Sequence, residues 1–187
     1  KFVNNKKISK MKINIEKFNK KNICFTGMMG AGKSVIGRQF AKIINYGFVD
    51  TDTLIEEKSG EKINKIFEIY GEDYFRKYEE KIILDVLKLK NVVISLGGGS
   101  ILNKSIRKVM SKNSFTIYLE VNIDVLNKRL KNSKKRPLLK NQNIKQKLQS
   151  LLNDRKKYYN KANLVINNSI NKTYIIKELK NHFSEHE

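Results

Sequence analysis

The sequence contains few residues of the kinds that cross-link a chain or anchor it in a membrane. Its 187 residues include one cysteine, one proline and no tryptophan, and no apolar run approaches the ~18 residues of a membrane span. A single cysteine excludes an intramolecular disulfide and favours a reducing compartment. The N-terminus also lacks the apolar segment of a signal peptide. We therefore expect a cytoplasmic protein that has no membrane partner.

Acidic residues are scarce relative to basic ones. The chain carries 39 Lys+Arg against 18 Asp+Glu, a formal net charge of +21, which raises the question of a nucleic-acid partner. The lysines are scattered along the whole chain together with Asn and Ile, a pattern typical of AT-rich coding sequences. We therefore expect no nucleic-acid partner. We also expect small-molecule substrates and a monomer.

The chain consists of two regions that differ in composition. Residues 1–20 are rich in Lys and Asn with weak apolar periodicity, which predicts a flexible extension. Residues 21–187 contain no internal repeat and no Pro/Gly/Ser-rich linker. Their length and hydrophobic content predict a single domain with its own core.

Short apolar runs alternate with helical patterns over this domain. The runs predict strands at 23–26, 46–52, 92–96, 115–120 and 164–167, and the patterns predict helices at 35–44, 53–58, 63–70, 73–90, 104–110, 123–130, 144–161 and 173–183. This alternation predicts an α/β fold, in which a five-stranded parallel sheet is covered by helices on both faces.

Residues 27–34 read GMMGAGKS and match the phosphate-binding pattern G-x-x-x-x-G-K-[ST] at every fixed position. The stretch lies between a predicted strand and a predicted helix, where such a loop belongs. Its glycines allow backbone N–H groups to turn toward a phosphate, and the helix N-terminus adds its dipole. We expect Lys33 to reach the β- and γ-phosphates of ATP and Ser34 to ligate Mg²⁺. The complete set of expected ATP contacts in this loop is Gly30, Ala31, Gly32, Lys33, Ser34 and Val35.

Two carboxylates, Asp50 and Asp52, follow the second predicted strand. Ligands of parallel α/β sheets bind at the carboxyl ends of the strands, so both side chains should face the phosphate site. Together with the phosphate loop, the pair indicates one carboxylate that organises a metal ion and one directed at a substrate hydroxyl. For Asp52, capping of the following helix is an equally reasonable role.

Three further features stand out, and two of them, the glycine triplet and the basic loop, point to ligand binding. The glycine triplet at 97–99 is entropically costly, which indicates backbone that lies against a ligand. Arg76 precedes Glu79 by three positions, a spacing typical of a weak, solvated helix salt bridge. The basic loop around Arg136 is of the kind that carries an arginine over a bound nucleotide in phosphoryl-transfer enzymes.

Taken together, these motifs resemble those of the shikimate kinase family, P-loop kinases of the nucleoside-monophosphate-kinase type. The resemblance extends from residue 22 onward and rests on GMMGAGKS at 27–34, DTD at 50–52, FRKYE at 75–79, GGG at 97–99, RPLL at 136–139, and Arg155 with Tyr159 and Ala162. It implies a three-layer fold with the strand order 2-3-1-4-5 and a mobile lid at about 132–143. It also implies that ATP phosphorylates the 3-hydroxyl of shikimate, giving shikimate 3-phosphate and ADP in chorismate and aromatic amino-acid biosynthesis.

The resemblance further implies roles for individual residues. Arg76 and Arg155 would hold the shikimate carboxylate, since guanidinium forks suit a planar carboxylate. Asp52 and the backbone amide of Gly98 would hold the ring hydroxyls. Asp52 would also orient or deprotonate the attacking 3-hydroxyl.

On the nucleotide side, the resemblance implies that Ser34 ligates Mg²⁺ directly and that Asp50 holds it through water. Arg136 would reach the phosphates of ATP, so that Lys33, Asp52 and Arg136 form the catalytic set. One departure from the family is the segment 155–159, which reads RKKYY in place of the common Arg-x-Pro-x-Tyr.

Two other classes of protein remain open. Another small-molecule P-loop kinase, of the gluconate or nucleoside-monophosphate type, would share the loop and the lid. It would not need the Asp50/Asp52 pair, Arg76 and the glycine triplet together. A catalytically silent nucleic-acid-binding or regulatory protein would have no reason to keep two arginines suited to a carboxylate.

Overall fold

Five parallel strands form the centre of the protein. The computed structural model describes residues 11–131, 143–169 and 171–184. The strands are β1 (Asn22–Thr26), β2 (Gly47–Asp50), β3 (Val92–Ser95), β4 (Ser114–Glu120) and β5 (Leu164–Asn167), paired in the order β2-β3-β1-β4-β5. This arrangement confirms the expected fold class, and β5 has the predicted limits.

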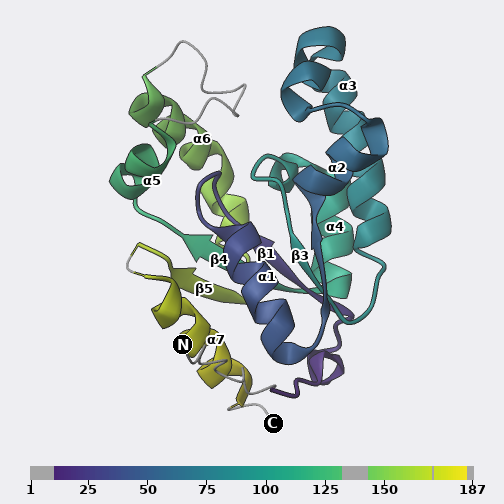
Figure 1. The fold of residues 1–187 in the computed structure, drawn as a ribbon, viewed down its shortest axis with the longest axis vertical. Helices are drawn as coiled ribbons and strands as arrows, with labels where there is room; N and C mark the ends of the chain where they lie inside the picture. The colour runs from purple at the N-terminus through teal and green to yellow at the C-terminus, as the bar shows by residue number, and fades with distance from the viewer. Residues whose placement is uncertain (1–10, 132–142, 170, 185–187) are drawn as a thin grey trace, which may run out of the picture.

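Helices cover the sheet on both faces (Figure 1). They are α1 (Lys33–Ile44), α2 (Thr51–Ser59), α3 (Ile63–Val86), α4 (Lys104–Asn113), α5 (Ile123–Leu130), α6 (Ile144–Tyr159) and α7 (Lys172–Ser184), with short 3-10 turns η1 (Ile15–Phe18) and η2 (Ser100–Leu102). α1 and α7 pack together on one face, and α4 lies on the other beside α3. Beyond the strand ends, α2 and α3 rise on one side and α5 and α6 on the other.

The buried face of α1 illustrates how the sequence builds these layers. Ile36, Phe40 and Ile43 recur at helical spacing and are buried against the sheet, whereas Val35 faces outward and is 52% exposed. The helix ends at Asn45, which adopts the left-handed conformation and directs its N–H to the Ala41 carbonyl. Helix α1 therefore holds its N-terminal turn, which carries the phosphate loop, rigidly against the sheet.

Helix α3 is interrupted at Gly71. This residue has φ 79° and ψ 174°, which no helix can contain, so the stretch consists of two helical segments. The two patterns predicted at 63–70 and 73–90 are therefore both present, although the second helix ends at Val86. Likewise, α2 begins at Thr51, two residues before its predicted start.

Residues 11–20 pack onto the domain, in contrast to the flexible extension that their composition predicts. The Met11 N–H donates to the Ile43 carbonyl at 2.9 Å. Ile15 is buried, and the Phe18 ring meets those of Phe115 and Phe183 at centroid distances of 4.8 and 5.9 Å. These contacts lie far apart in the sequence, so local composition does not reveal them.

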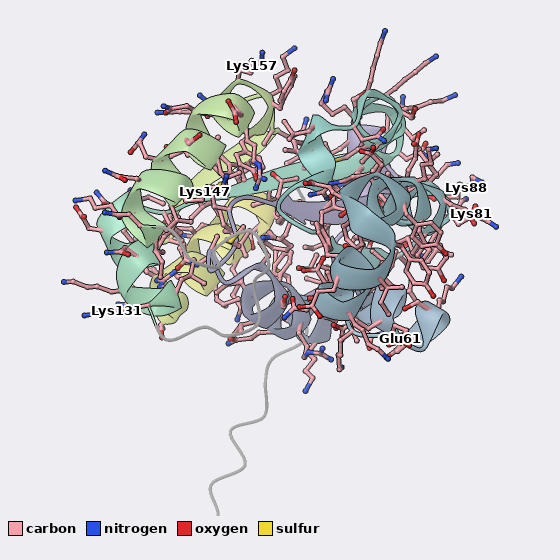
Figure 2. The ribbon with its side chains drawn as sticks, turned by 90° about the horizontal axis from the view of Figure 1, so that it is seen from above. Glu61, Lys81, Lys88, Lys131, Lys147 and Lys157 are labelled. Atoms are coloured by element: carbon pink, nitrogen blue, oxygen red, sulfur yellow. The ribbon has the colours of Figure 1, made fainter. Side chains whose placement is uncertain are left out.

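The lysines extend outward over opposite sides of the molecule. Figure 2 labels Lys131, Lys147 and Lys157 on one side, and Lys81 and Lys88 on the other. This distribution agrees with the scatter seen in the sequence and forms no single stripe. No helix within the described ranges is both long enough and apolar enough to cross a membrane.

The packing of residues 11–20 leads to a stability prediction. Ile15→Ala should lower the free energy of unfolding by roughly 2–4 kcal/mol, because it leaves a cavity beneath η1. Ile69→Ala is the matched control, since Ile69 is 54% exposed, and should change stability by less than about 0.5 kcal/mol. Chemical denaturation measures both, and equal effects of the two substitutions would show that η1 does not belong to the core.

Candidate active site

The phosphate loop connects β1 to α1 at the carboxyl edge of the sheet. Gly27, the first residue of the motif, has φ 137°, and a Cβ placed there would lie 2.7 Å from the Leu119 carbonyl oxygen. Only glycine fits this turn. The Lys33 side chain folds back along the loop, and its Nζ donates to the carbonyls of Gly27 at 2.9 Å and Met28 at 3.0 Å. The ammonium group therefore lies inside the curve of the loop.

A cavity of about 220 Å³ opens beside this loop. Ser34 and Asp50 both line it, and the Ser34 hydroxyl lies 3.3 Å from that of Ser95 at the end of β3. Asp50 is the N-cap of α2, because its Oδ1 accepts from the N–H groups of Asp52 at 3.1 Å and Thr53 at 3.3 Å. The capping role considered for Asp52 thus falls to Asp50, and Asp52 lies in the first turn of α2.

A second cavity of about 210 Å³ adjoins the first. Met29, Asp52 and Gly98 line both, so the two cavities meet at these residues. The polar lining of the second cavity consists of Asp52, Thr53, Glu56, Arg76, Glu79 and Arg155 with the backbone of the glycine triplet, and its apolar lining of Met29, Ile63, Phe67 and Phe75. A polar ligand bound here would lie next to the phosphate loop.

Arg76 is held by two carboxylates on its own helix. Its Nη1 lies 2.7 Å from Glu79 Oε2, and its Nη2 lies 2.9 Å from Glu72 Oε1. The Glu79 side chain is only 3% exposed, so the interpretation of Arg76 and Glu79 as a solvated pair is wrong. The pair is buried because the glycine triplet covers it. A Cβ at Gly99 would lie 2.7 Å from the Arg76 guanidinium.

Arg155 reaches the same cavity from α6. Its side chain is 2% exposed. Within the described residues its Nε and Nη1 have no hydrogen-bond partner. Buried polar atoms are nearly always paired, because an unpaired one costs free energy, so two unpaired guanidinium nitrogens indicate a site for an external acceptor. The structure thus brings Arg76 and Arg155 to one cavity.

The glycine triplet is fixed from several directions. The Gly97 N–H donates to Thr51 Oγ1 at 3.0 Å, and the Tyr159 hydroxyl donates to the Gly98 carbonyl at 2.6 Å. A Cβ at Gly98 would lie 3.2 Å from both the Gly27 carbonyl oxygen and the Met29 amide nitrogen. The triplet therefore lies directly against the phosphate loop, which explains why side chains are absent there.

Similarity to known proteins identifies the family. The sequence model for shikimate kinase matches residues 29–183. The chain is 45% identical over 140 residues to the shikimate kinase of Actinobacillus pleuropneumoniae serotype 5b, covering 75% of this chain and 81% of that protein. The chain belongs to the shikimate kinase family.

Solved structures of the shikimate kinase family agree with this assignment. The shikimate kinase from Acinetobacter baumannii, in complex with shikimate, superimposes with a TM-score of 0.84 at 30% identity, covering 93% of this chain and 99% of that one. A gluconokinase from Sinorhizobium meliloti is 18% identical with a TM-score of 0.60, a similarity that extends to the fold alone.

Among the residues given no role from the sequence, Glu79 is the most prominent. Burial raises the pKa of its carboxyl to about 7, Arg76 and Arg155 oppose this rise, and Asp52 adds to it. The three-residue spacing indicates that Glu79 pairs with Arg76. Only the packing of the Glu79 side chain shows that Glu79 lines the cavity. Arg129 was also missed, and no motif marks it. Its Nη1 donates to the Gly30 carbonyl at 3.2 Å.

The remaining site residues predicted for this member of the family divide into two groups. Gly30, Gly32, Lys33, Ser34 and Val35 all line the cavity at the phosphate loop, and Ala31 is buried within the loop. Arg136 and positions 132–142 of the predicted lid lie outside the described residues.

The raised pKa of Glu79 predicts a pH dependence of stability. An ordinary glutamate has a pKa of about 4.3, so between that value and about 7 the folded protein binds more protons than the unfolded chain. Stability should therefore fall as the pH rises through this window. We expect wild-type protein to lose about 1–3 kcal/mol more between pH 5 and pH 7.5 than Glu79→Gln. Denaturation at each pH measures the difference, and parallel curves for the two proteins would refute the assignment.

Proposed function

We propose that this protein transfers the γ-phosphoryl group of ATP to the 3-hydroxyl of shikimate, giving shikimate 3-phosphate and ADP on the route to chorismate and the aromatic amino acids. The observation that carries the proposal is the junction of two cavities at Asp52, one beside the phosphate loop and one containing two arginines. A kinase needs this arrangement, because phosphoryl transfer depends mainly on holding donor and acceptor in line.

Arg76 and Arg155 are assigned to the acceptor's carboxylate. Arg155 supports this assignment through two buried nitrogens that have no hydrogen-bond partner in the part of the chain that the structure describes. Arg76 supports it through its orientation, because Glu72 and Glu79 fix its guanidinium at the cavity wall. Two forked cations suit a planar carboxylate and thus favour an acceptor that carries one over a nucleotide. Gluconate also carries a carboxylate, so the choice of shikimate over gluconate is supported by the family.

Asp52 is assigned to the acceptor hydroxyl. It lines both cavities and lies close to the glycine triplet, since a Cβ at Gly97 would be 2.6 Å from its Oδ1. A carboxylate there can accept the hydroxyl proton, directing a lone pair of the oxygen at the γ-phosphorus. Since the transition state of phosphoryl transfer is loose, orientation contributes more than base strength. The Gly98 amide is assigned to a neighbouring ring hydroxyl.

The phosphate loop and its surroundings are assigned to MgATP. The Ser34 hydroxyl and the Asp50 carboxylate line one cavity, and such hard oxygen donors, one of them anionic, fit Mg²⁺. Bound Mg²⁺ would neutralise charge on the phosphate oxygens. When ATP binds, the Lys33 ammonium would leave the carbonyls of Gly27 and Met28 and contact the β- and γ-phosphates instead. Arg136 remains assigned to the ATP phosphates on the sequence resemblance alone.

A substrate panel tests the proposed function directly. Coupled ADP release should be rapid with shikimate and at background level with gluconate and AMP, while quinate tests tolerance for a changed ring. Shikimate methyl ester should be a poor substrate, because it removes the charge that the arginines bind. Rapid turnover of gluconate or AMP in place of shikimate would assign the enzyme to another class of P-loop kinase.

The carboxylate assignment predicts the behaviour of Arg155→Ala. Loss of a charge-assisted contact should cost roughly 2–4 kcal/mol in kcat/KM for shikimate, while the KM for ATP changes little. Arg38→Ala is a control. Arg38 extends from α1 over the ring of Phe48 in β2, and it is not among the residues that line either cavity. Steady-state kinetics distinguish the two variants. An Arg155→Ala enzyme with unchanged kcat/KM for shikimate would remove Arg155 from the acceptor site.

The phosphate-loop assignment predicts that Lys33→Ala loses turnover by a factor on the order of 10²–10³ or more, because the transferring phosphoryl group loses its cation. The variant should still fold, since Lys33 lines the cavity beside the phosphate loop and water entering that cavity can bond to the Gly27 and Met28 carbonyls. Circular dichroism checks the fold and ADP release the turnover. Near-normal turnover in a folded variant would exclude Lys33 from the mechanism.

A further inference from the structure

Tyr159, the last residue of α6, contacts three elements of the site. Its hydroxyl donates to the Gly98 carbonyl at 2.6 Å and lies 4.0 Å from Met28 Sδ in the phosphate loop. The Arg155 guanidinium, one helical turn earlier, lies close enough to this hydroxyl to lower its pKa. One hydroxyl group thus joins the arginine assigned to the carboxylate, the glycine assigned to a ring hydroxyl, and the loop assigned to ATP.

Packing fixes the direction of this hydroxyl. The Tyr159 ring stacks on that of Tyr118 in β4, with centroids 4.9 Å apart and planes inclined by 17°, and both side chains are buried. Burial raises the pKa of the Tyr159 hydroxyl despite the opposing effect of Arg155. At neutral pH the group is therefore a protonated donor, aimed by a rigid ring at one carbonyl oxygen.

Gly98 needs such a restraint. A glycine backbone can adopt many torsion angles, and consecutive glycines cannot hold a carbonyl or an amide in one direction by themselves. Within the triplet, the Thr51 hydroxyl fixes the Gly97 amide and the Tyr159 hydroxyl fixes the Gly98 carbonyl. The Gly97 carbonyl, which shares a peptide with the Gly98 amide, accepts from the Ser100 N–H at 3.2 Å and from the Ser100 hydroxyl. Tyr159 holds the next peptide, through the Gly98 carbonyl, and so fixes Gly98 on its other side.

We propose that Tyr159 is a positioning residue that couples Arg155 to Gly98, and so sets the separation between the group that holds the acceptor's carboxylate and the amide that holds its hydroxyl. The proposal rests on the proposed function and extends it to the acceptor's orientation. It assigns Tyr159 no contact with the reacting atoms. Its effect should therefore appear in shikimate binding and turnover and leave nucleotide binding nearly unchanged.

Tyr159→Phe tests this coupling with little disturbance, because it removes the hydroxyl and keeps the stacked ring. We expect the KM for shikimate to rise about tenfold, the size of one lost hydrogen bond, with the KM for ATP within about twofold of wild type. Tyr158→Phe is the matched control. Its ring lies under Arg107 at 4.0 Å and lines neither cavity, so both constants should remain those of the wild type.

Restoring the donor separates positioning from simple packing. 4-Aminophenylalanine at position 159 keeps a hydrogen-bond donor in the para position and should bring the KM for shikimate most of the way back. 4-Fluorophenylalanine, similar in size but without a donor, should behave as Tyr159→Phe and serves in its place if that variant does not fold. In the double variant Arg155→Lys/Tyr159→Phe, the fold-increase in the KM for shikimate should be smaller than the product of the two single fold-increases, since both changes interrupt one network.

Several results would overturn the proposal. These are an unchanged KM for shikimate in a folded variant without the donor, no recovery with 4-aminophenylalanine, or fully multiplicative effects in the double variant. Failure of the proposed function is distinguishable, because wild type and Tyr158→Phe would then not phosphorylate shikimate at all. Active wild type with an unaffected Tyr159→Phe would refute only the coupling through Tyr159.

Discussion

Direct backbone contact between the phosphate loop and the glycine triplet is the constraint on which the rest of the site depends. A side chain at Gly98 would separate the two loops, and side chains at Gly97 or Gly99 would displace Asp52 or Arg76. Because all three positions lack side chains, the donor and acceptor cavities can share a wall. The closeness of two loops from neighbouring strands thus creates the geometry that an in-line transfer requires.

The two arginines of the acceptor cavity, the one lined by Arg76 and Arg155, differ in how they are paired. Arg76 is paired twice, so its position is fixed before any ligand binds, whereas two guanidinium nitrogens of Arg155 have no partner among the described residues. One arginine is therefore preorganised and the other retains unsatisfied donors. A ligand carboxylate, as proposed for this cavity, would gain from both properties, since the first lowers the cost of ordering and the second supplies new hydrogen bonds.

Much of the fold and the placement of the motifs could be predicted from the sequence, because strand and helix patterns and glycine-rich loops are local signals. The strand order was not read from composition but from family resemblance, and the structure confirms it. The burial of Glu79 could not be predicted, because it depends on Gly97 to Gly99 folding over a helix that precedes them. The packing of Phe18 could not be predicted for the same reason, since its partners Phe115 and Phe183 come from the distant β4 and α7.

The interruption of α3 at Gly71 affects the dimensions of the acceptor cavity. Ile63 and Phe67 line the cavity from the segment before this residue, and Arg76 and Glu79 from the segment after it. One wall of the cavity is therefore built from two helical segments, which are joined at the backbone torsion angles of Gly71. A change in those two angles would move one segment relative to the other, and would thereby widen or narrow the cavity without a change in the residues that line it.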